Sequence, residues 1–194
     1  MTEIDIRTQI LDATEARFSQ YGYNKTTMAE IARDCGMSAA NLYRYFKNKL
    51  DIGAALAQQC LAEKESVLVE IVNDDKLTSS ERLEAFIMHV LHHTYHHFND
   101  APKLSELVDA MAVQCPSVVD AHRQSKLVLL EQLLQSAIDK GEFSVLDIPA
   151  TADAIHTAIS VFALPTVMPM YSLEQLEKKA KDLSALLLTG LQTR

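Results

Sequence analysis

Five histidines lie within nine residues of the chain, a density that suggests metal-ion chemistry first; they are His89, His92, His93, His96 and His97. Imidazole nitrogens four residues apart on one helix face can chelate a divalent cation. At about 100° per residue, however, His93 and His97 flank the apolar stripe of this segment, and the other three point mostly away from it. Three interpretations remain open: a solvated helix surface, the lining of a pocket for an organic effector, and a metal or haem site.

The motifs of the common enzyme classes are missing from the sequence. A zinc metalloprotease requires H-E-x-x-H, but His93 stands between His92 and His96 where the glutamate base belongs. A ferritin-like di-iron centre requires two Glu-x-x-His pairs, and the chain offers only Asp153-x-x-His156. The glycines are too widely spaced for a phosphate-binding loop or a nucleophile elbow. We therefore expect no catalytic residues, no metal site and no cofactor, and we do not expect an enzyme.

The second candidate group is the stretch SAANLYRYFKNK at residues 38–49, which brings three aromatic side chains together with basic ones. The chain has a formal net charge of −8, but residues 1–50 hold seven Lys/Arg against six Asp/Glu, whereas residues 51–194 hold eleven against twenty. A phosphate group responds to charges within a Debye length of about 8–10 Å, so the acidic total does not exclude nucleic acid. This stretch is therefore a candidate nucleic-acid contact.

Helices must position both groups, because the chain includes only five glycines and five prolines and no run of alternating β-branched residues. Apolar spacing and cap signals predict an all-α fold of about nine helices. Their expected ranges are 4–21, 27–35, 38–45, 48–72, 80–98, 103–113, 117–140, 150–164 and 172–192. Gly22 is expected to end the first helix, and Pro165 to stop the eighth. The last helix carries a leucine seam from Leu173 to Leu191, which requires another helix as its partner.

The composition is typical of a soluble protein with a substantial core, since 48% of its residues are hydrophobic. Cys35, Cys60 and Cys115 are odd in number and lack C-x-x-C spacing, so neither a disulfide framework nor a zinc finger is indicated. No apolar run approaches the roughly 18 to 20 residues of a spanning helix, and the N-terminus does not resemble a signal peptide. We therefore expect a cytoplasmic protein that does not contact membranes.

Residues 27–45 have the layout of a helix-turn-helix, two short helices joined by a tight turn. Thr27 opens the first helix with a capping-box pattern, Gly36 supplies the turn, and Ala32 is small where the helices cross. The residues expected to fill the core beneath are Ile31, Met37, Leu42 and Phe46. The residues left facing outward are Ser38, Ala39, Ala40, Asn41, Tyr43, Arg44 and Tyr45. A tyrosine hydroxyl reaches a phosphate oxygen, and small residues let a helix N-terminus enter the major groove, so this face fits duplex DNA.

The segment TTMAEIARDCGMSAANLYRYFKNK at residues 26–49 resembles the N-terminal domain of the TetR family of bacterial transcriptional regulators. Residues 6–56 follow the family pattern in register, at positions that include Ile10, Ala13, Phe18, Gly22, Ile31, Gly36, Leu42 and Phe46. The resemblance implies a three-helix helix-turn-helix domain at 1–50, joined through a long helix to a larger helical ligand-binding and dimerisation domain at 51–194. Beyond residue 56 it rests on architecture alone.

The resemblance also implies individual DNA contacts. The residues that it assigns to phosphate contacts are Thr27, Tyr43, Tyr45 and Lys49. Base reading would fall to Ala39, Ala40, Asn41 and Arg44. Asparagine can pair with adenine, arginine with guanine, and alanine methyl groups can contact the thymine methyl group. Ser38 would either join these contacts or serve only as the helix cap.

In this family the effector cavity is usually enclosed by helices 4 to 8. The candidate walls in this chain are Phe86, Val90, His93, His97, Met111, His122, His156, Phe162 and Met168. A mostly apolar cavity with a few polar groups is the usual form of a small-molecule pocket, although the same residues also suit plain core packing. The resemblance further implies that the last two helices pair with those of a second copy in a four-helix bundle.

These observations predict a ligand-responsive transcriptional regulator that binds a palindromic double-stranded DNA operator as a homodimer. We expect it to act as a repressor that an unidentified small-molecule effector releases from DNA. One alternative is a metal- or haem-sensing regulator of the same fold, which would use the histidines of residues 89–97. The other is an all-helical enzyme or interaction module that does not bind DNA.

Overall fold

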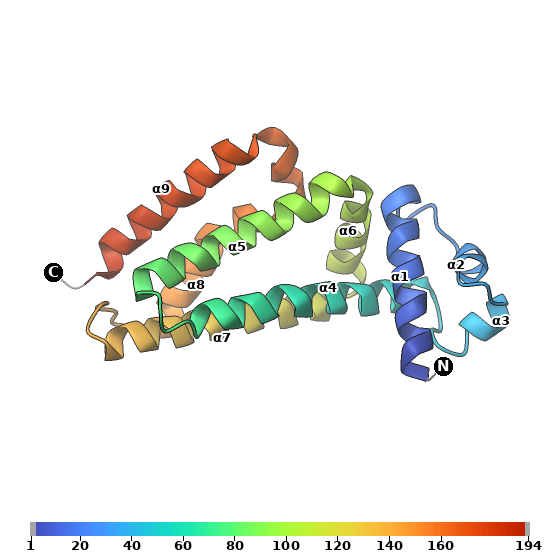
Figure 1. The fold of residues 1–194 in the computed structure, drawn as a ribbon, viewed down its shortest axis with the longest axis horizontal. Coiled ribbons are helices and arrows are strands. Elements are labelled where there is room, and N and C mark those ends of the chain that lie inside the picture. The colour runs from blue at the N-terminus through green and yellow to red at the C-terminus, as the bar shows by residue number, and fades with distance from the viewer. Residues whose placement is uncertain (1–2, 193–194) are drawn as a thin grey trace. The chain divides into compact units, whose positions relative to one another are not determined.

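The chain folds into helices joined by short connections in the computed structural model, which describes residues 3–192 (Figure 1). The α-helices are α1 (Glu3–Tyr21), α2 (Met28–Asp34), α3 (Ala39–Leu42), α4 (Lys49–Val72), α5 (Ser79–Asp100), α6 (Ser105–Gln114), α7 (Pro116–Asp139), α8 (Ile148–Ile159) and α9 (Leu173–Leu191). The 3₁₀ helices are η1 (Pro102–Leu104), η2 (Ser160–Ala163) and η3 (Pro165–Met170). Within residues 3–192 no strand forms, so the predicted all-α fold is confirmed. None of the helices in this range combines the length and the apolar character that a membrane crossing requires.

The eighth helix ends earlier than predicted. The helix expected over 150–164 stops at Ile159, and the chain continues as the 3₁₀ helix η2. Leu164 is then extended, with φ −93° and ψ 116°, because the ring of the following Pro165 disfavours a helical conformation for the residue before it. The proline therefore accounts for the end of the helical path at Leu164, and the change from α-helix to 3₁₀ helix lies before it, at Ser160.

The described residues form two compact units. The N-terminal unit comprises 3–62 and 100–120, and the C-terminal unit comprises 63–99 and 121–192. Helices α4 and α7 each begin in the N-terminal unit and end in the C-terminal unit. The sequence predicts a division of roles near residue 50, whereas the compact units divide α4 at residue 62 and assign a later segment to the N-terminal unit.

Side-chain contacts explain why η1 and α6 belong to the N-terminal unit. Lys103 Nζ donates to the Gln20 carbonyl at 2.7 Å, and the Glu106 carboxylate accepts from the Asn24 N–H at 2.9 Å. Gly22 has a φ of +88°, as predicted for the residue that ends α1, and a Cβ added there would lie 2.6 Å from the Glu106 carboxylate. The two hydrogen bonds join residues that are 82 and 83 positions apart in the sequence, and no local sequence pattern predicts such contacts.

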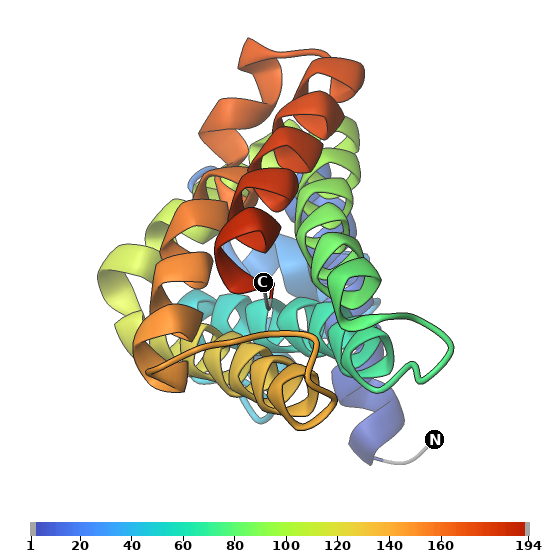
Figure 2. The same cartoon turned by 90° about the vertical axis from the view of Figure 1, so that its left-hand side faces the viewer.

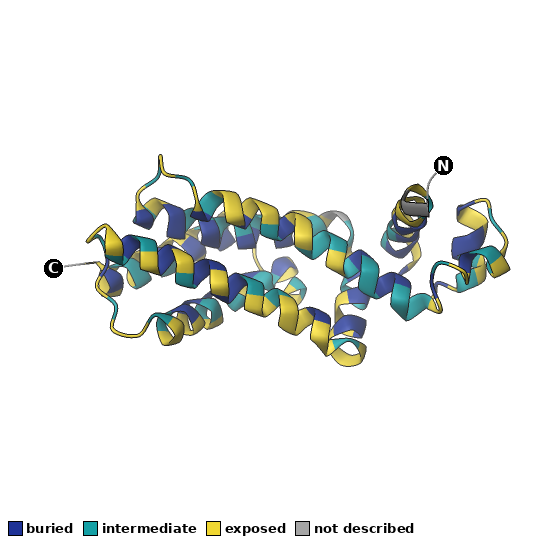
Figure 3. Cartoon of the chain, turned by 90° about the horizontal axis from the view of Figure 1, so that it is seen from below, coloured by how far each residue is buried: buried dark blue, intermediate teal, exposed yellow. Residues whose placement is uncertain are grey.

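The C-terminal unit is built around one buried apolar cluster to which α4, α5, α7, α8 and α9 all contribute. Helix α9 lies beside α5 and α8 (Figures 1 and 2), and His92 Nε2 of α5 is 2.7 Å from Glu177 Oε1 of α9. Along α9, Leu176 and Ala180 are buried while Leu186 is 70% exposed. Figure 3 shows the same alternation of buried and exposed residues on the helices. Burying one leucine side chain contributes about 1.5–3 kcal/mol, so this cluster is the main source of stability in the unit.

A buried arginine joins three elements of the C-terminal unit. Arg82 is 2% exposed, and its Nη1 donates to the carbonyl of Val72 at the end of α4, at 2.9 Å. Its Nη2 donates to Ser79 Oγ at 3.0 Å and to Ser136 Oγ of α7 at 3.4 Å. The backbone N–H of Ser79 in turn donates to the Glu142 carboxylate at 2.8 Å. The guanidinium group thereby satisfies one of the carbonyl groups that the end of a helix leaves unpaired.

Replacing Arg82 with methionine removes these donors while keeping a side chain of similar bulk. We expect the free energy of unfolding to fall by about 1–3 kcal/mol, because the Val72 carbonyl is left buried without its partner. Urea unfolding followed by circular dichroism measures the change. The matched control is Lys76→Met at an exposed site in the same unit, where a change within about 0.5 kcal/mol is expected. An Arg82→Met protein as stable as the wild type would contradict the role of this guanidinium group.

Candidate nucleic-acid interface

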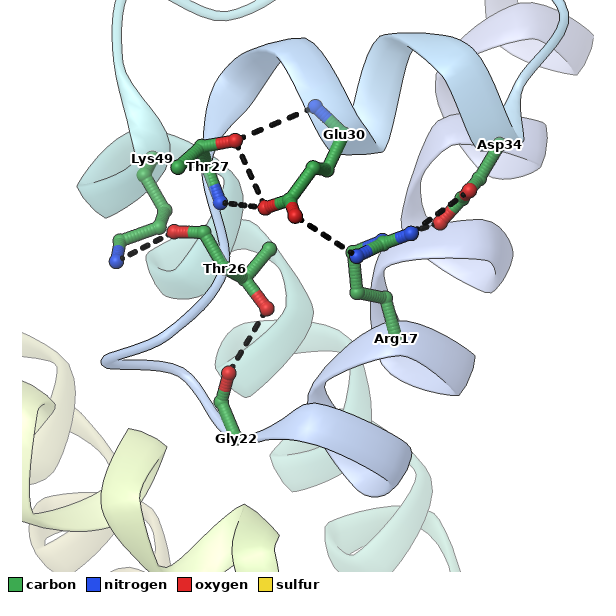
Figure 4. A network of polar contacts seen from close by, with 7 residues as sticks. All are labelled: Arg17, Gly22, Thr26, Thr27, Glu30, Asp34 and Lys49. Atoms are coloured by element: carbon green, nitrogen blue, oxygen red, sulfur yellow. Dashed lines mark hydrogen bonds and ion pairs between the residues drawn. The ribbon is translucent and has the colours of Figure 1, made fainter.

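Helix α2 begins at a capping box and ends at a glycine turn. The Thr27 N–H donates to Glu30 Oε2 at 2.9 Å, and the Glu30 N–H donates to Thr27 Oγ1 at 3.4 Å (Figure 4). Two amide groups that the start of a helix leaves unpaired are satisfied in this way. Gly36 follows the helix with a φ of +65°, and the Met37 N–H reaches back to the Ala32 carbonyl at 2.9 Å. The predicted cap and turn are therefore both present.

Helix α3 is a single turn and is shorter than predicted. Ser38 is its N-cap, with Oγ accepting from the Asn41 N–H at 3.2 Å. The helix expected to reach Tyr45 stops at Leu42, because the N–H groups of Arg44 and Tyr45 bond to carbonyls three residues back, at 3.1 and 3.0 Å. Such bonds tighten the chain beyond the α-helical path. Tyr43, Arg44 and Tyr45 therefore follow α3 as a tight turn.

The two short helices bury one side and expose the other. The anchoring residues are 0–3% exposed and are Ile31, Ala32, Leu42 and Phe46. Met37, also predicted to be buried, is only half-buried, and its Sδ lies 4.0 Å from Asn41 Nδ2. The residues of the outward side are exposed or half-buried and are Ser38, Ala39, Ala40, Asn41, Tyr43, Arg44 and Tyr45. Tyr43 is 52% exposed, so a large aromatic ring with a hydroxyl group faces solvent.

Arg17 of α1 holds α2 in place. It is 9% exposed and forms a bidentate pair with Asp34, through Nε to Oδ2 and through Nη2 to Oδ1 at 2.9 Å (Figure 4). Its Nη1 also lies 3.7 Å from Glu30 Oε1. A guanidinium group paired at both ends of its fork restricts geometry as well as contributing energy. Sequence reasoning missed this residue, although its spacing of seven residues from Ile10 and three from Thr14, both buried, was a signal that it lies on the inward face of α1.

Lys49, expected to contact phosphate, holds the connection between α1 and α2 in this structure. Its Nζ donates to the carbonyls of Tyr23 at 2.7 Å and Thr26 at 2.9 Å, and it lies 4.3 Å from the centre of the Tyr23 ring. Thr26 Oγ1 donates to the Gly22 carbonyl at 2.8 Å, so the same connection is bonded at a second point (Figure 4). An ammonium group has three N–H donors. Two are used here, which leaves one for an anion.

The residues expected to line an effector pocket fall in both units. Met111 belongs to the N-terminal unit, is 3% exposed, and its methyl group would lie 3.4 Å from a Cβ added at Gly53. The other eight belong to the C-terminal unit. Those in its buried apolar cluster are Phe86, Val90, Phe162 and Met168.

The histidines of the C-terminal unit are held by specific neighbours. The rings of His93 and His97 are stacked with their centres 5.8 Å apart. His122 Nδ1 lies 2.6 Å from Glu65 Oε1, and His89 Nε2 lies 3.3 Å from the Lys64 carbonyl. Burial, reinforced by the Lys64 charge, lowers the pKa of His93 to about 3, so this ring is neutral at neutral pH. Among the residues that the structure describes, no three His, Cys, Asp or Glu side chains converge as a metal site.

These features together define a helix-turn-helix DNA-binding protein: a capped helix, a glycine turn and a second helix anchored from beneath. The exposed face carries hydroxyl, amide and guanidinium groups. Comparison with known proteins agrees with this class. The family model for bacterial regulatory proteins of the tetR family matches residues 10–56, and a model for a tetracyclin repressor-like C-terminal domain matches residues 79–184. The chain belongs to the TetR family of bacterial transcriptional regulators, which are ligand-responsive DNA-binding proteins rather than enzymes.

Individual relatives support the same assignment. The uncharacterized HTH-type transcriptional regulator YvkB of Bacillus subtilis (strain 168) is 30% identical over 69% of this chain and 68% of its own length. The fold is similar to that of SmeT, the repressor of the Stenotrophomonas maltophilia multidrug efflux pump SmeDEF, with a TM-score of 0.72, 23% identity, and coverage of 96% of this chain and 90% of that one. It is also similar to FadR from Bacillus subtilis in complex with stearoyl-CoA, with a TM-score of 0.71, 21% identity, and coverage of 94% and 98%.

Asp34→Asn tests whether the Arg17 pair stabilises the N-terminal unit. The hydrogen bond from Arg17 lowers the pKa of Asp34 below its ordinary value of 3.8, and burial opposes this shift. A lowered pKa contributes stability that is present above the ordinary value and is lost as the pH falls through the lowered one. We therefore expect Asp34→Asn to be less stable than the wild type at neutral pH. When the pH is lowered below about 4, the variant should lose less stability than the wild type does.

Urea unfolding across a pH series measures both effects. The matched control is Asp12→Asn on the exposed side of α1. A variant whose stability falls with pH as steeply as that of the wild type would show that this pair does not stabilise the fold.

Proposed function

We propose that this protein is a homodimeric repressor that binds a near-palindromic operator and leaves it when a small-molecule effector binds. The observation that carries the proposal is the outward side of α3 and of the turn that follows it, where Tyr43 and Arg44 are exposed next to the buried anchor Leu42. A twofold dimer presents two such faces, so the half-sites would lie about 34–36 Å apart or at a multiple of that distance. We further infer that the protein acts in the cytoplasm, where the operator lies.

The proposed DNA contacts divide into base reading and positioning. Base reading is assigned to Ala39, Ala40, Asn41 and Arg44, with Ser38 as the cap at the groove, and phosphate contacts are assigned to Thr27, Tyr43, Tyr45 and Lys49. Thr27 Oγ1 already donates to Glu30 Oε2 at 2.8 Å, so a phosphate oxygen must displace that bond. Lys49 can contact a phosphate with its third N–H while it keeps both carbonyl bonds.

Selection from a random duplex library tests the proposed function as a whole. Full-length protein is incubated with the library at moderate salt, and bound duplexes are amplified and sequenced over several rounds. We expect enrichment of an inverted repeat, because each protomer of a twofold dimer reads one half-site. A library that stays random after selection would overturn the proposal.

Lys49→Ala and Arg44→Ala separate positioning from base reading. Lys49→Ala removes a proposed phosphate contact, so it should weaken binding to all sequences and lower the slope of log affinity against log salt by about one. Arg44→Ala removes a proposed base contact, so it should cost about 1–3 kcal/mol of binding free energy on the selected site and relax the base preference at one position. Fluorescence anisotropy on the selected duplex and its single-base variants, over a salt series, measures both.

The control for these variants is Lys76→Met, an exposed site outside the helix-turn-helix. Because Lys49 also bonds to two carbonyls of its own unit, the melting temperature of Lys49→Ala is compared with that of the wild type at the start. If the two alanine variants change slope and preference alike, the division of roles is wrong.

Dimerisation is proposed through α8 and α9 and the turns that connect them. Exposed apolar side chains gather there, and those at least 40% exposed include Val161, Leu164, Met170 and Leu186. A groove beside Leu186 is lined by residues of α8, α9 and the preceding loop, among them Leu146, Ile155 and Leu187. Exposed apolar side chains of this size are typical of a protein interface, and a second copy would bury them.

Leu186→Asp tests this interface. An uncompensated charge buried at an interface costs about 3–5 kcal/mol, so we expect the dissociation constant of the dimer to increase by about 100-fold or more. Sedimentation velocity over a range of protein concentrations measures the change. Val113→Asp, at an 81% exposed site on α6, is the matched control and should remain dimeric. A Leu186→Asp protein with the dissociation constant of the wild type would place the interface elsewhere.

Effector release is proposed to act through α4. This helix runs from Lys49 in the N-terminal unit to Val72 in the C-terminal unit, so it is a covalent connection through which an effector in one unit would act on the other. FadR, similar in fold, is known in complex with stearoyl-CoA, which supports an organic effector for this protein as well. Coupling of about 1–3 kcal/mol would change operator affinity by about 5- to 150-fold.

A further inference from the structure

Arg7, near the start of α1, contacts the turn that follows α3. Its Nη1 donates to the Tyr45 carbonyl at 2.9 Å, and its Cζ lies 4.3 Å from the centre of the Phe46 ring. Arg7 and Tyr45 are 38 positions apart in the sequence and belong to the same N-terminal unit, where the first turns of α1 lie beside this turn (Figure 1). The guanidinium group is therefore joined to the segment that carries the exposed Tyr43 and Arg44.

The position of Arg7 on α1 explains how it reaches this turn. At 100° per residue, the residues four, seven and eleven positions later point within about 40° of Arg7. They are Leu11, Thr14 and Phe18, and all three are buried. Arg7 itself is exposed, because it lies one turn before this buried stripe begins. Its side chain thus follows the inward side of α1 to the Phe46 ring and is still open to solvent.

These contacts leave the charge of Arg7 available to an anion. The Tyr45 carbonyl and the Phe46 ring carry no net charge, so neither of them neutralises the guanidinium group. Arg17, on the same helix, instead contacts the carboxylate of Asp34. A guanidinium group has five N–H donors, and the Tyr45 carbonyl takes one of them. Arg7 can therefore bind an anion without giving up the contacts that hold it.

The segment that Arg7 contacts is itself basic. Residues 38–49 include three Lys/Arg and no Asp/Glu, so Arg7 adds a positive charge beside a segment that already attracts anions. Tyr45 and Lys49 of this segment are proposed above as phosphate contacts. The planar fork of a guanidinium group matches the oxygens of a phosphate, and most hydrogen bonds between protein and DNA go to phosphate and sugar. A backbone phosphate of the operator is thus the anion that fits this position.

We propose that Arg7 is a further DNA-contact residue, which holds the turn after α3 through the Tyr45 carbonyl and the Phe46 ring and donates to an operator phosphate with its remaining N–H groups. Because the guanidinium group is already held by the turn that carries Tyr43 and Arg44, less conformational entropy is lost when DNA binds. The inference rests on the proposed function, since it adds a contact to the same DNA-binding surface.

Arg7→Gln and Arg7→Lys separate a phosphate contact from a purely structural brace. Glutamine keeps an N–H donor for the Tyr45 carbonyl but loses the charge, whereas lysine keeps the charge and loses the planar fork. Both are good helix formers at an exposed site, so the fold should be retained, and melting temperatures check this.

Fluorescence anisotropy on the selected duplex, over a salt series, measures the effect of each variant. We expect Arg7→Gln to bind about tenfold more weakly than the wild type, with unchanged base preference and a slope of log affinity against log salt lowered by about one. Arg7→Lys should keep the slope of the wild type. Lys76→Met, which removes an exposed charge outside the helix-turn-helix, is the control and should bind as the wild type does.

Duplexes in which one phosphate at a time is replaced by a neutral methylphosphonate locate the contact. At the phosphate that Arg7 contacts, the replacement should weaken the wild type but weaken Arg7→Gln much less, because the charged partner is already missing. At every other phosphate the losses from the variant and from the replacement should add. A brace that does not touch DNA predicts additive losses at all positions.

Two results would overturn the Arg7 contact: a salt slope of Arg7→Gln equal to that of the wild type, or losses that add at every phosphate. Duplex selection with the wild-type protein is carried out before these measurements. A protein that selects a duplex but gives either result would refute the Arg7 contact alone. A protein that selects no duplex would refute the proposed function, and the Arg7 contact with it.

Discussion

Helix α3 has only four residues and is not stable by itself. The surface proposed to bind DNA therefore depends on the contacts that hold this helix in place. The first turn of a helix fixes several dihedral angles for a single hydrogen bond, so α3 must be stabilised by tertiary contacts. Leu42 and Phe46 anchor it from beneath, the turn at Gly36 sets its approach, and Ser38 caps its start. Because these residues carry the stability, the outward residues are free to be small, polar or aromatic as binding requires.

Neighbouring polar groups compensate a buried arginine in each of the two units. Arg17 in the N-terminal unit is matched by Asp34 and Glu30, and Arg82 in the C-terminal unit is bonded to a helix carbonyl and two hydroxyl groups. Since an uncompensated buried charge is costly, these bonds give both arginines a structural role.

Local signals predict local structure well in this chain, and they fail where distant residues meet. The capping box at Thr27 and the glycine turns at Gly22 and Gly36 were predictable, because each depends on residues within one helical turn. The membership of α6 in the N-terminal unit was not, since it depends on contacts such as Glu106 to Asn24 across 82 positions. The outward side of the helix-turn-helix followed from helical periodicity. The inward bonds of Lys49 did not, because two carbonyls distant in the sequence receive them.

The central claim is that the segment from the capping box to the start of α4 contacts duplex DNA while its own core holds it in shape. Hydrogen–deuterium exchange of the full-length protein, with and without the selected duplex, tests this claim most directly. The account predicts slower amide exchange within residues 27–49 when DNA is bound, centred on α3 and the turn that follows it. Unchanged exchange over residues 27–49, with DNA-dependent protection confined to other segments, would contradict it.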